Sequence, residues 1–554
     1  MKHARFRSPV RPPIQAPAVT SKAISKHQPS TDRPMTHIPR RTFLKTTLGG
    51  TAGLVALPDI FGGSLLGASS PNGSGTLEDR LSIQTGALSD YKRVSSFGFN
   101  TCHAVLAMRS DLQEHMARAN RELGMRYWRC HGTLSDDVGV ATKGPGGEIR
   151  YTFSGLKRIL DKGLSQGMKP FFEISFMPSA LARDASKTVC HYRAITSPPA
   201  DWDQWRDLIA KLMGFLVDTY GLEELRKWYF EVWNEPNIPF WAGTQAEYFR
   251  LYRDVALALK AADPQLRVGG PATARGEWVA DLLAFCGQTR TPIDFVSTHI
   301  YPSDVAFSDS AQGAVKRLGT EYLHENVVRV QREVSAHSPA LPIIWGEWNS
   351  SAGPFAESHD ECNNAALISA ALAMFEDHSN GSLFWNLSDI YEEAQYHFSP
   401  FHGGYGLYTV DGIAKSAARA FEFWHSLNGQ RAQIDGLPAT CARGAFATHD
   451  VATNQTQVLL WNHLEPGTTG SDWALSLEVR GSAARSAAVL AVVPENGSAY
   501  EKWISMGRPL NLSVAQRGAL EEASQPLASL VDANAKSVFS LKIAPGTLTK
   551  LTLK

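Results

Sequence analysis

Eight short apolar runs recur along the middle of the chain, and amphipathic stretches of helical period separate them. The runs are rich in aromatic and β-branched residues, which is typical of strands buried on both faces. Strands that alternate with helices predict βαβ units, and eight such strands close a (β/α)8 barrel. The predicted strands are Ser95–Asn100, Met125–Cys130, Pro170–Phe176, Trp228–Trp233, Leu266–Gly269, Phe295–His299, Leu341–Gly346 and Gly381–Asn386. The clearest helices are Asp111–Leu123, Trp202–Tyr220 and Lys415–Asn428.

The fourth of these runs ends at an acid. Residues 228–241 read WYFEVWNEPNIPFW, so Glu235 follows the strand and precedes Pro236. Pro236 lacks an N–H and disfavours helical backbone before it, which ends the strand and predicts extended geometry at Glu235. A carboxyl group among Trp233, Phe240 and Trp241 has a raised pKa and keeps its proton near neutrality. We interpret Glu235 as a general acid; the alternative is a structural Glu at a strand end.

The seventh run ends in the same way. Residues 341–351 read LPIIWGEWNSS, which places Glu347 at the tip of another apolar strand. The two acids are too far apart in the chain for one hairpin, and barrel enzymes take active-site residues from the carboxyl ends of different strands. A pair of carboxylates among Trp and Asn side chains favours hydrolysis of a glycoside, because indoles pack on sugar C–H faces.

Many motifs around these acids resemble those of glycoside hydrolase family 39 β-xylosidases. The family carries WNEPN after the fourth strand and TEWN-like sequence after the seventh; this chain has WNEPN from Trp233 and GEWN from Gly346, with Gly in place of the usual Thr. The similarity runs from about Phe97 to the C-terminus. It includes HGTLSDDVG from His131, FMPSALA from Phe176, SPPADW from Ser197, THIYP from Thr298, FWNLSDIYEE from Phe384 and FHGGYGL from Phe401.

The resemblance implies an exo-acting, retaining β-D-xylosidase (a xylan 1,4-β-xylosidase) that releases xylose from the non-reducing ends of xylo-oligosaccharides. Glu235 would be the acid/base and Glu347 the nucleophile, and no cofactor is required. Two alternatives stay open. One is the same machinery acting on an arabinoside, a glucoside or a uronide. The other is a carbohydrate-binding homologue without activity.

Further site residues follow from the matched motifs. The resemblance implies that Asn234 bonds the sugar 2-hydroxyl and that His131 contacts a xylose hydroxyl. His299 and Tyr301 stand two residues apart on an extended chain and so point to the same side. We expect Tyr301 to bond Glu347 and His299 to orient the sugar or the acid/base.

Two aromatic residues, Phe176 and Trp385, are expected to wall the pocket. The acids of the YEE motif are candidates for outer hydroxyl binding; we assign Glu392, with Glu393 as the alternative. A uronide-specific pocket needs Lys or Arg beside the sugar carboxylate, and no basic cluster stands near these motifs in the sequence.

The texture of the chain changes near Ala432. Helical periodicity fades, and Gln457–Trp461, Ala487–Val493, Val538–Ile543 and Thr547–Leu553 resemble short antiparallel strands. We predict a β-sandwich over residues 431–554, packed on a barrel over residues 95–430. The family resemblance implies that strands from residues 78–94 join this sandwich.

Residues 1–77 are predicted to be an export signal and a linker. Arg40-Arg41 precede a modest apolar run that is too short to span a membrane, as in a twin-arginine signal. Met35 is an alternative start, and a cleavage near Ala68 would leave a Ser/Gly-rich linker. The predicted location is periplasmic or extracellular, with no membrane span.

The net charge and the cysteine spacing bear on whether the chain binds nucleic acid, a membrane or a metal. Lys plus Arg and Asp plus Glu each number 54, so the chain has no overall field for nucleic acid or an anionic membrane. The six cysteines show no CxxC and no Cys/His spacing typical of zinc, which predicts no structural metal. We expect buried free thiols, with a disulfide after export as the alternative. The oligomeric state is not predicted.

Overall fold

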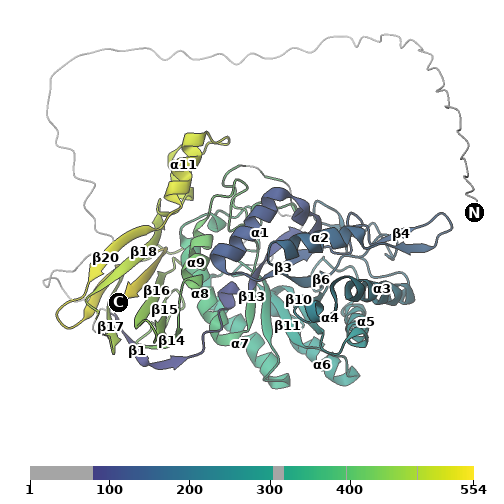
Figure 1. Cartoon of the computed structure of the whole chain (residues 1–554), viewed down its shortest axis with the longest axis horizontal. Coiled ribbons are helices and arrows are strands. Elements are labelled where there is room, and N and C mark those ends of the chain that lie inside the picture. The colour runs from purple at the N-terminus through teal and green to yellow at the C-terminus, as the bar shows by residue number, and fades with distance from the viewer. Residues whose placement is uncertain (1–78, 304–316, 395, 398, 483, 554) are drawn as a thin grey trace, which may run out of the picture. The chain divides into compact units, whose positions relative to one another are not determined.

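The computed structural model describes residues 79–303, 317–394, 396–397, 399–482 and 484–553 (Figure 1). The predicted export signal and linker, with Met35 and Ala68, lie outside these residues. Eight parallel strands form a closed barrel, in the order β2-β3-β6-β9-β10-β11-β12-β13. All eight predicted strands are present, with bounds that differ by a few residues. They are β2 Gly98–His103, β3 Tyr127–His131, β6 Lys169–Ile174, β9 Tyr229–Val232, β10 Arg267–Thr273, β11 Phe295–Ile300, β12 Ile343–Trp348 and β13 Gly381–Phe384.

Helices surround the barrel and follow most of its strands (Figure 1). Local signals set their starts: Asp201 accepts from the N–H groups of Asp203 and Gln204 at the start of α3, and Thr244 and Glu247 form a capping box on α5. The helices are α1 Ser110–Leu123, α2 Ser154–Ser165, α3 Trp202–Tyr220, α4 Leu222–Leu225, α5 Gln245–Ala262, α6 Val279–Thr289, α7 Gly319–His337, α8 Asn363–His378 and α9 Ser416–His425.

Short elements decorate the loops. Two small hairpins pair β4 Ala141–Lys143 with β5 Ile149–Tyr151 and β7 Thr188–Val189 with β8 Ala194–Ile195. The single 3₁₀ turns are η1 Val94–Ser96, η2 Ala104–Met108, η3 Ala274–Gly276 and η4 Glu357–His359.

The interior of the barrel is apolar at one end and polar at the other. Phe171, Phe295, Ile344 and Leu383 form a buried cluster near the starts of their strands. Arg129, Glu173 and Glu231 point inward further along and are fully buried. The apolar cluster closes the amino-terminal end, and the polar side chains gather toward the carboxyl end, where (β/α)8 barrels carry their functional sites.

The C-terminal region forms a mixed sheet of ten strands. Its path is β19-β18-β22-β16-β15-β14-β1-β17-β21, and β20 pairs with β18. One core contains side chains from β1, β17 and β21 and from β15, β16, β18 and β22, so the sheet bends over itself around a shared interior. The strands are β1 Asp79–Ser89, β14 Gln430–Asp435, β15 Arg443–Asp450, β16 Gln455–Asn462, β17 Trp473–Arg480, β18 Ser486–Pro494, β19 Gly497–Ser498, β20 Leu527–Asp532, β21 Val538–Ile543 and β22 Thr547–Leu553.

Two helices interrupt this sheet, which the fading helical period did not predict. They are α10 Tyr500–Ser505 and α11 Val514–Ala523. Trp503 of α10 packs on Phe401, with ring centroids 5.6 Å apart, and Tyr500 Oη donates to Glu357 Oε1 at 3.1 Å. This insertion therefore supports loops that follow β12 and β13 of the barrel.

The barrel and the sheet contact each other through an aromatic pair and a hydrogen bond. Trp424 of α9 packs on Phe446 of β15 with ring centroids 4.6 Å apart, and Gln457 donates to the carbonyl of Ser426 at 3.2 Å. None of the helices described here combines the length and the apolar character needed to cross a membrane.

Candidate active site

Glu235 lies in a tight turn directly after β9. The strand ends at Val232, and both Trp233 (φ 70°) and Glu235 (φ 43°) adopt left-handed backbone. The extended geometry predicted for Glu235 is therefore wrong: the restriction imposed by Pro236 excludes the right-handed helical region, and tertiary contacts select the left-handed one. The N–H of Glu235 donates to the carbonyl of Ala272 at the end of β10, at 2.8 Å. This turn aims the carboxyl group into the barrel mouth.

Glu347 lies within β12, which is separated from β10 by one strand, β11, in the barrel. Its neighbour Gly346 faces the ring of His299, and a Cβ atom there would lie 3.0 Å from His299 Nε2 and 3.2 Å from Glu231 Oε1. The glycine that replaces the usual Thr therefore lets the His299 ring approach the strand closely. Tyr301 Oη donates to Glu347 Oε2 at 3.0 Å, which is the contact expected from the sequence.

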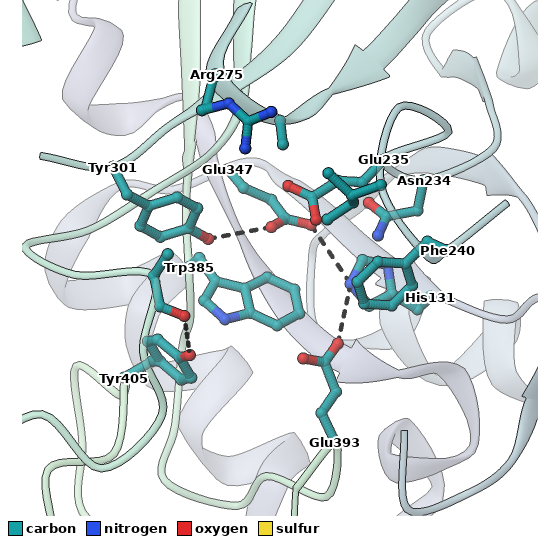
Figure 2. Close-up of a pocket in the computed structure, with 13 residues that line it drawn as sticks. His131, Asn234, Glu235, Phe240, Arg275, Tyr301, Glu347, Trp385, Glu393 and Tyr405 are labelled. Atoms are coloured by element: carbon teal, nitrogen blue, oxygen red, sulfur yellow. Dashed lines mark hydrogen bonds and ion pairs between the residues drawn. The ribbon is translucent and has the colours of Figure 1, made fainter. Parts of the chain in front are cut away.

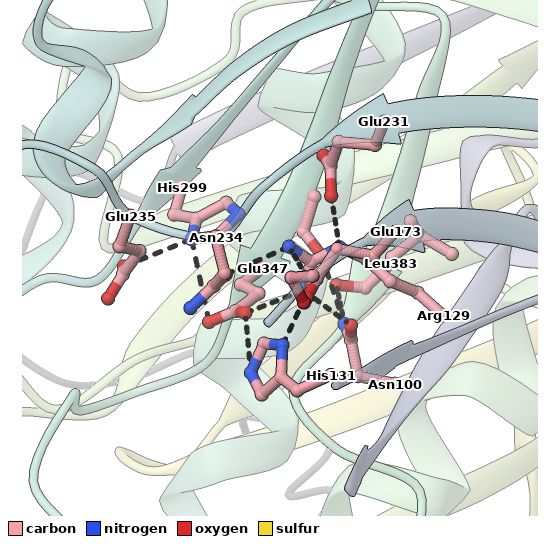
Figure 3. A network of polar contacts seen from close by, with 12 residues as sticks. Asn100, Arg129, His131, Glu173, Glu231, Asn234, Glu235, His299, Glu347 and Leu383 are labelled. Carbon is pink, nitrogen blue, oxygen red and sulfur yellow. Dashed lines mark hydrogen bonds and ion pairs between the residues drawn. The ribbon is translucent and has the colours of Figure 1, made fainter. Parts of the chain in front are cut away.

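The two acids meet across His299 (Figure 3). A carboxylate oxygen of Glu235, a carboxylate oxygen of Glu347 and a ring nitrogen of His299 all lie within 4.8 Å of one another. His299 Nδ1 is 3.0 Å from Glu235 Oε1 and 3.5 Å from Glu347 Oε2. Of the two roles predicted for His299, the geometry favours orienting the acid/base.

Arg129 of β3 holds the polar floor together, and sequence reasoning missed it. Its guanidinium group is fully buried and lies 2.7 Å from Glu347 Oε1, 2.7 Å from Glu173 Oε2 and 2.6 Å from Glu231 Oε2. It also donates to Asn234 Oδ1 at 2.9 Å. One planar cation with several donors thus fixes the nucleophile candidate and the residue before the acid.

The electrostatics separate the two acids. Burial raises the pKa of Glu235 well above its usual value, and the negative charge of Glu347 raises it further. Burial also raises the pKa of Glu347, to about 7, although Arg129 and His131 pull it down. Glu347 is therefore the first of the pair to ionise, and Glu235 retains its proton.

His131 is a cation in this setting. Burial lowers the pKa of His131, but the surrounding carboxylates outweigh burial and raise it to about 10. Nδ1 lies 2.8 Å from Glu173 Oε2, and Nε2 lies 3.4 Å from Glu347 Oε1 and 3.3 Å from Glu393 Oε1. The imidazolium therefore bridges the nucleophile candidate and a wall residue of the pocket.

A pocket opens above the two acids (Figure 2). Glu235 and Glu347 are 6% and 4% exposed, and Trp385 packs against His131 with ring centroids 4.8 Å apart. Tyr391 Oη donates to Glu393 Oε2 at 2.9 Å and fixes that side chain. The lining residues are His131, Asn234, Glu235, Ile238, Phe240, Ala274, Arg275, Tyr301, Glu347, Ala352, Trp385, Glu393 and Tyr405.

Three predicted site residues are not part of this lining. His299 is fully buried and contacts the two acids through Nδ1. Phe176 is fully buried behind Phe240, with parallel rings 6.0 Å apart, so it supports the wall and does not form it. Glu392 turns away and bonds His103 and Tyr396, and its neighbour Glu393 faces the pocket. Adjacent residues of one loop point in opposite directions, which the sequence YEE alone does not resolve.

The structure also brings two side chains to the pocket, Arg275 and Tyr405, that were not predicted as site residues. Arg275 lies in η3, just after β10, and its Nε donates to Glu277 Oε1 at 2.8 Å. No basic cluster stands near the matched motifs in the sequence, because Arg275 is distant in the chain from both acids. Tyr405 stands on the opposite wall in the FHGGYGL motif, and its Oη donates to the carbonyl of Ala352 at 2.7 Å. Its motif was recognised, but its side chain was not singled out.

A (β/α)8 barrel with two buried carboxyl groups at its carboxyl end defines a glycoside hydrolase. The profile of Glycosyl hydrolases family 39 matches residues 82–537, and the chain belongs to this family.

Proteins similar to this chain support that assignment. A β-xylosidase of Caldicellulosiruptor saccharolyticus is 36% identical over 82% of this chain and 94% of its own length. A β-xylosidase of Geobacillus stearothermophilus is 34% identical over 77% of this chain and 86% of its own. A solved structure is also similar: the crystal structure of the family 39 enzyme from Xanthomonas axonopodis pv. citri. It matches this chain with a TM-score of 0.76 and 31% sequence identity, over 88% of this chain and 99% of the other chain.

Proposed function

We propose that this protein is a retaining, exo-acting β-D-xylosidase that releases xylose from the non-reducing ends of xylo-oligosaccharides. One observation carries the proposal: carboxylate oxygens of Glu235 and Glu347 lie within 4.8 Å of each other. Carboxyl groups about 5–5.5 Å apart are typical of retaining enzymes, and inverting pairs stand about 6.5–9.5 Å apart. The β-xylosidases that are similar over most of the chain support the sugar.

In the first step, Glu347 attacks the anomeric carbon while Glu235 protonates the glycosidic oxygen. The carbon–oxygen bond to the leaving group breaks, and a glycosyl ester forms on Glu347. The raised pKa of Glu235 provides the proton near neutrality. Tyr301 and Arg129 hold Glu347 in place through opposite oxygens, so the attacking group is oriented before the substrate arrives.

In the second step, Glu235 acts as a base. It takes a proton from water, the hydroxyl attacks the anomeric carbon, and the ester bond to Glu347 breaks. The product keeps the β configuration, because the two displacements each invert the carbon. His299 stays neutral, since burial, Arg129 and His131 lower its pKa well below the usual value, and it orients Glu235 through Nδ1.

The exo-acting mode is supported by the far wall of the pocket. Trp385, Tyr405 and Glu393 stand around the space beside Glu347 and His131, where a single terminal sugar would sit. Xylotetraose labelled at its reducing end tests this mode by chromatography. Release of xylose with a labelled trisaccharide supports exo action, and labelled disaccharide as the first product contradicts it. NMR of the first anomer released tests retention.

The sugar is tested with a panel of p-nitrophenyl glycosides: the β-xyloside, the arabinoside, the β-glucoside and the β-glucuronide. We expect the highest kcat/KM on the xyloside, with E347Q as the inactive control. A preference for another glycoside would leave the roles of the two carboxylates standing and would replace xylose by that sugar as the substrate. No turnover of any of them by folded protein would favour a carbohydrate-binding homologue.

A second candidate, a substrate that carries a carboxylate, is favoured by Arg275. Its guanidinium group reaches the pocket beside Glu235, and its side chain is 31% exposed. Asn237 Oδ1 accepts from the N–H of Ala274, which ties this segment to the loop that carries the acid. An R275Q variant tests the candidate: a selective loss of kcat/KM on the glucuronide supports it, and an equal effect on xyloside and glucuronide contradicts it.

We further propose export by the twin-arginine route to the periplasm or the extracellular space. The support is the Arg40-Arg41 pair ahead of a mild apolar run. Expression of the full chain and of an R40K/R41K variant, followed by fractionation, tests this route. Retention of only the variant inside the cell is expected, and equal export of both would contradict it.

A further inference from the structure

Three potential metal ligands meet between helix α7 and the segment that joins β14 to β15. Glu321 and His324 lie one helical turn apart near the start of α7, and Cys441 lies two residues before β15. One donor atom from each residue lies within 4.8 Å of the others. We propose that Glu321, His324 and Cys441 bind Zn²⁺ and thereby attach the sheet to the barrel.

The distance between the thiol and the carboxylate fits a tetrahedral ion. Cys441 Sγ lies 3.7 Å from Glu321 Oε2. Zinc with a thiolate at about 2.3 Å and a carboxylate oxygen at about 2.0–2.2 Å sets these two atoms about 3.6 Å apart. Residues three apart on a helix project from the same face, so Glu321 and His324 approach the thiol from one side.

A further hydrogen bond prepares the carboxylate. Glu321 Oε1 accepts from the N–H of Cys441 at 3.0 Å, which leaves Oε2 facing the thiol. Bonds of this kind orient ligands around metals and raise affinity. Trp461 Nε1 donates to the carbonyl of Cys441 at 3.4 Å and holds the other side of this residue.

The local charge attracts a cation. The Glu321 carboxylate contacts the thiol, and Glu465 is a second carboxylate near Cys441. Binding of a divalent ion displaces the thiol proton. Glu465 is engaged by the N–H of Thr320 at 3.1 Å, so it contributes charge from a short distance.

The donor set selects the metal class. A thiolate, an imidazole and one carboxylate suit Zn²⁺, and a single oxygen ligand is too few for Mg²⁺ or Ca²⁺. Three protein ligands leave one position for water. Glu321 is exposed and the other two residues are half-buried, so the ion has access from solvent.

The test uses the full chain, reduced and freed of metal, with Co²⁺ and Zn²⁺ as probes. We expect one Co²⁺ per chain, with a thiolate-to-cobalt charge-transfer band and tetrahedral visible bands, and displacement of both by Zn²⁺. Zn²⁺ should also raise the Tm, because it binds the folded state. C441S should remove the charge-transfer band, and H324N and E321Q should weaken binding at least tenfold.

A matched variant on the same helix serves as the control. His337 is exposed at the last residue of α7, far along the helix from Glu321 and His324, so H337N should bind Co²⁺ as the unchanged chain does. Circular dichroism of each metal-free variant verifies the fold. Absence of a charge-transfer band in the unchanged chain, its persistence in C441S, or equal weakening by H324N and H337N would overturn the proposal.

Discussion

Replacement of Arg129 by Met tests whether one buried guanidinium holds both the fold and the nucleophile. The side chain is fully buried and contacts Glu173, Glu231 and Glu347 at 2.6–2.7 Å. Removal of one partner from a buried ion pair costs about 3–5 kcal/mol, because the other charges stay buried without compensation. We expect R129M to lower the free energy of unfolding by that amount.

The same variant should lose activity in a pH-dependent way. A charge-assisted hydrogen bond is worth about 1.5–3 kcal/mol, so loss of the bond to Glu347 predicts a fall of about 10- to 150-fold in kcat/KM. Arg129 is the strongest influence that lowers the pKa of Glu347. Without it, Glu347 ionises at higher pH, and the acidic limb of the kcat/KM profile should move upward.

Urea denaturation and xyloside hydrolysis across pH measure these effects. Arg150 is the matched control, since its side chain is 61% exposed and pairs with Glu148 on the surface. R150M should change the free energy of unfolding by less than about 1 kcal/mol and leave the pH profile unchanged. R129K keeps the positive charge but loses the planar set of guanidinium donors, so its effects on stability and on the pH profile should lie between those of R129M and R150M. A stable R129M with an unmoved acidic limb would refute the reasoning.

Three further predictions concern the acids. E235A should slow substrates with poor leaving groups far more than activated aryl xylosides, whereas E347A should abolish both; equal losses in E235A would contradict its role. E393Q should reduce kcat/KM on xylosides by about tenfold or more, because Glu393 lines the pocket and bonds His131, and E392Q should have a smaller effect; the reverse order would contradict the site. The kcat/KM profile should be bell-shaped: activity falls below the pKa of Glu347, where the nucleophile is protonated, and again above the raised pKa of Glu235, where the acid has lost its proton. A basic limb at the usual pKa of Glu would contradict this last assignment.

The sequence by itself determined the fold class and the two acids. Strand and helix alternation predicted the eight barrel strands, because hydrophobic periodicity is a local property of the chain. Glu235 and Glu347 were found because each ends an apolar run at a position that strand geometry makes functional. The strands Val538–Ile543 and Thr547–Leu553 were predicted with the bounds that the structure has.

Tertiary structure decided which side chains face the pocket. The sequence around Arg129 is that of an ordinary buried strand and does not indicate a functional residue. Its role depends on carboxylates that come from three other strands. Arg275 reaches the site only because β10 lies beside β9 in the closed barrel. Glu392 and Glu393 cannot be told apart from the sequence. Loop packing directs Glu392 toward His103 and Glu393 toward His131.

The same reason explains the backbone at Glu235 and the cluster at Cys441. Pro236 excluded one region of backbone space, and the hydrogen bond to Ala272 chose among the rest. Glu321, His324 and Cys441 have no motif spacing, because they come from separate elements that meet when the sheet packs beside α7. Local patterns therefore determine which elements form, and long-range packing determines the distances at which their side chains meet.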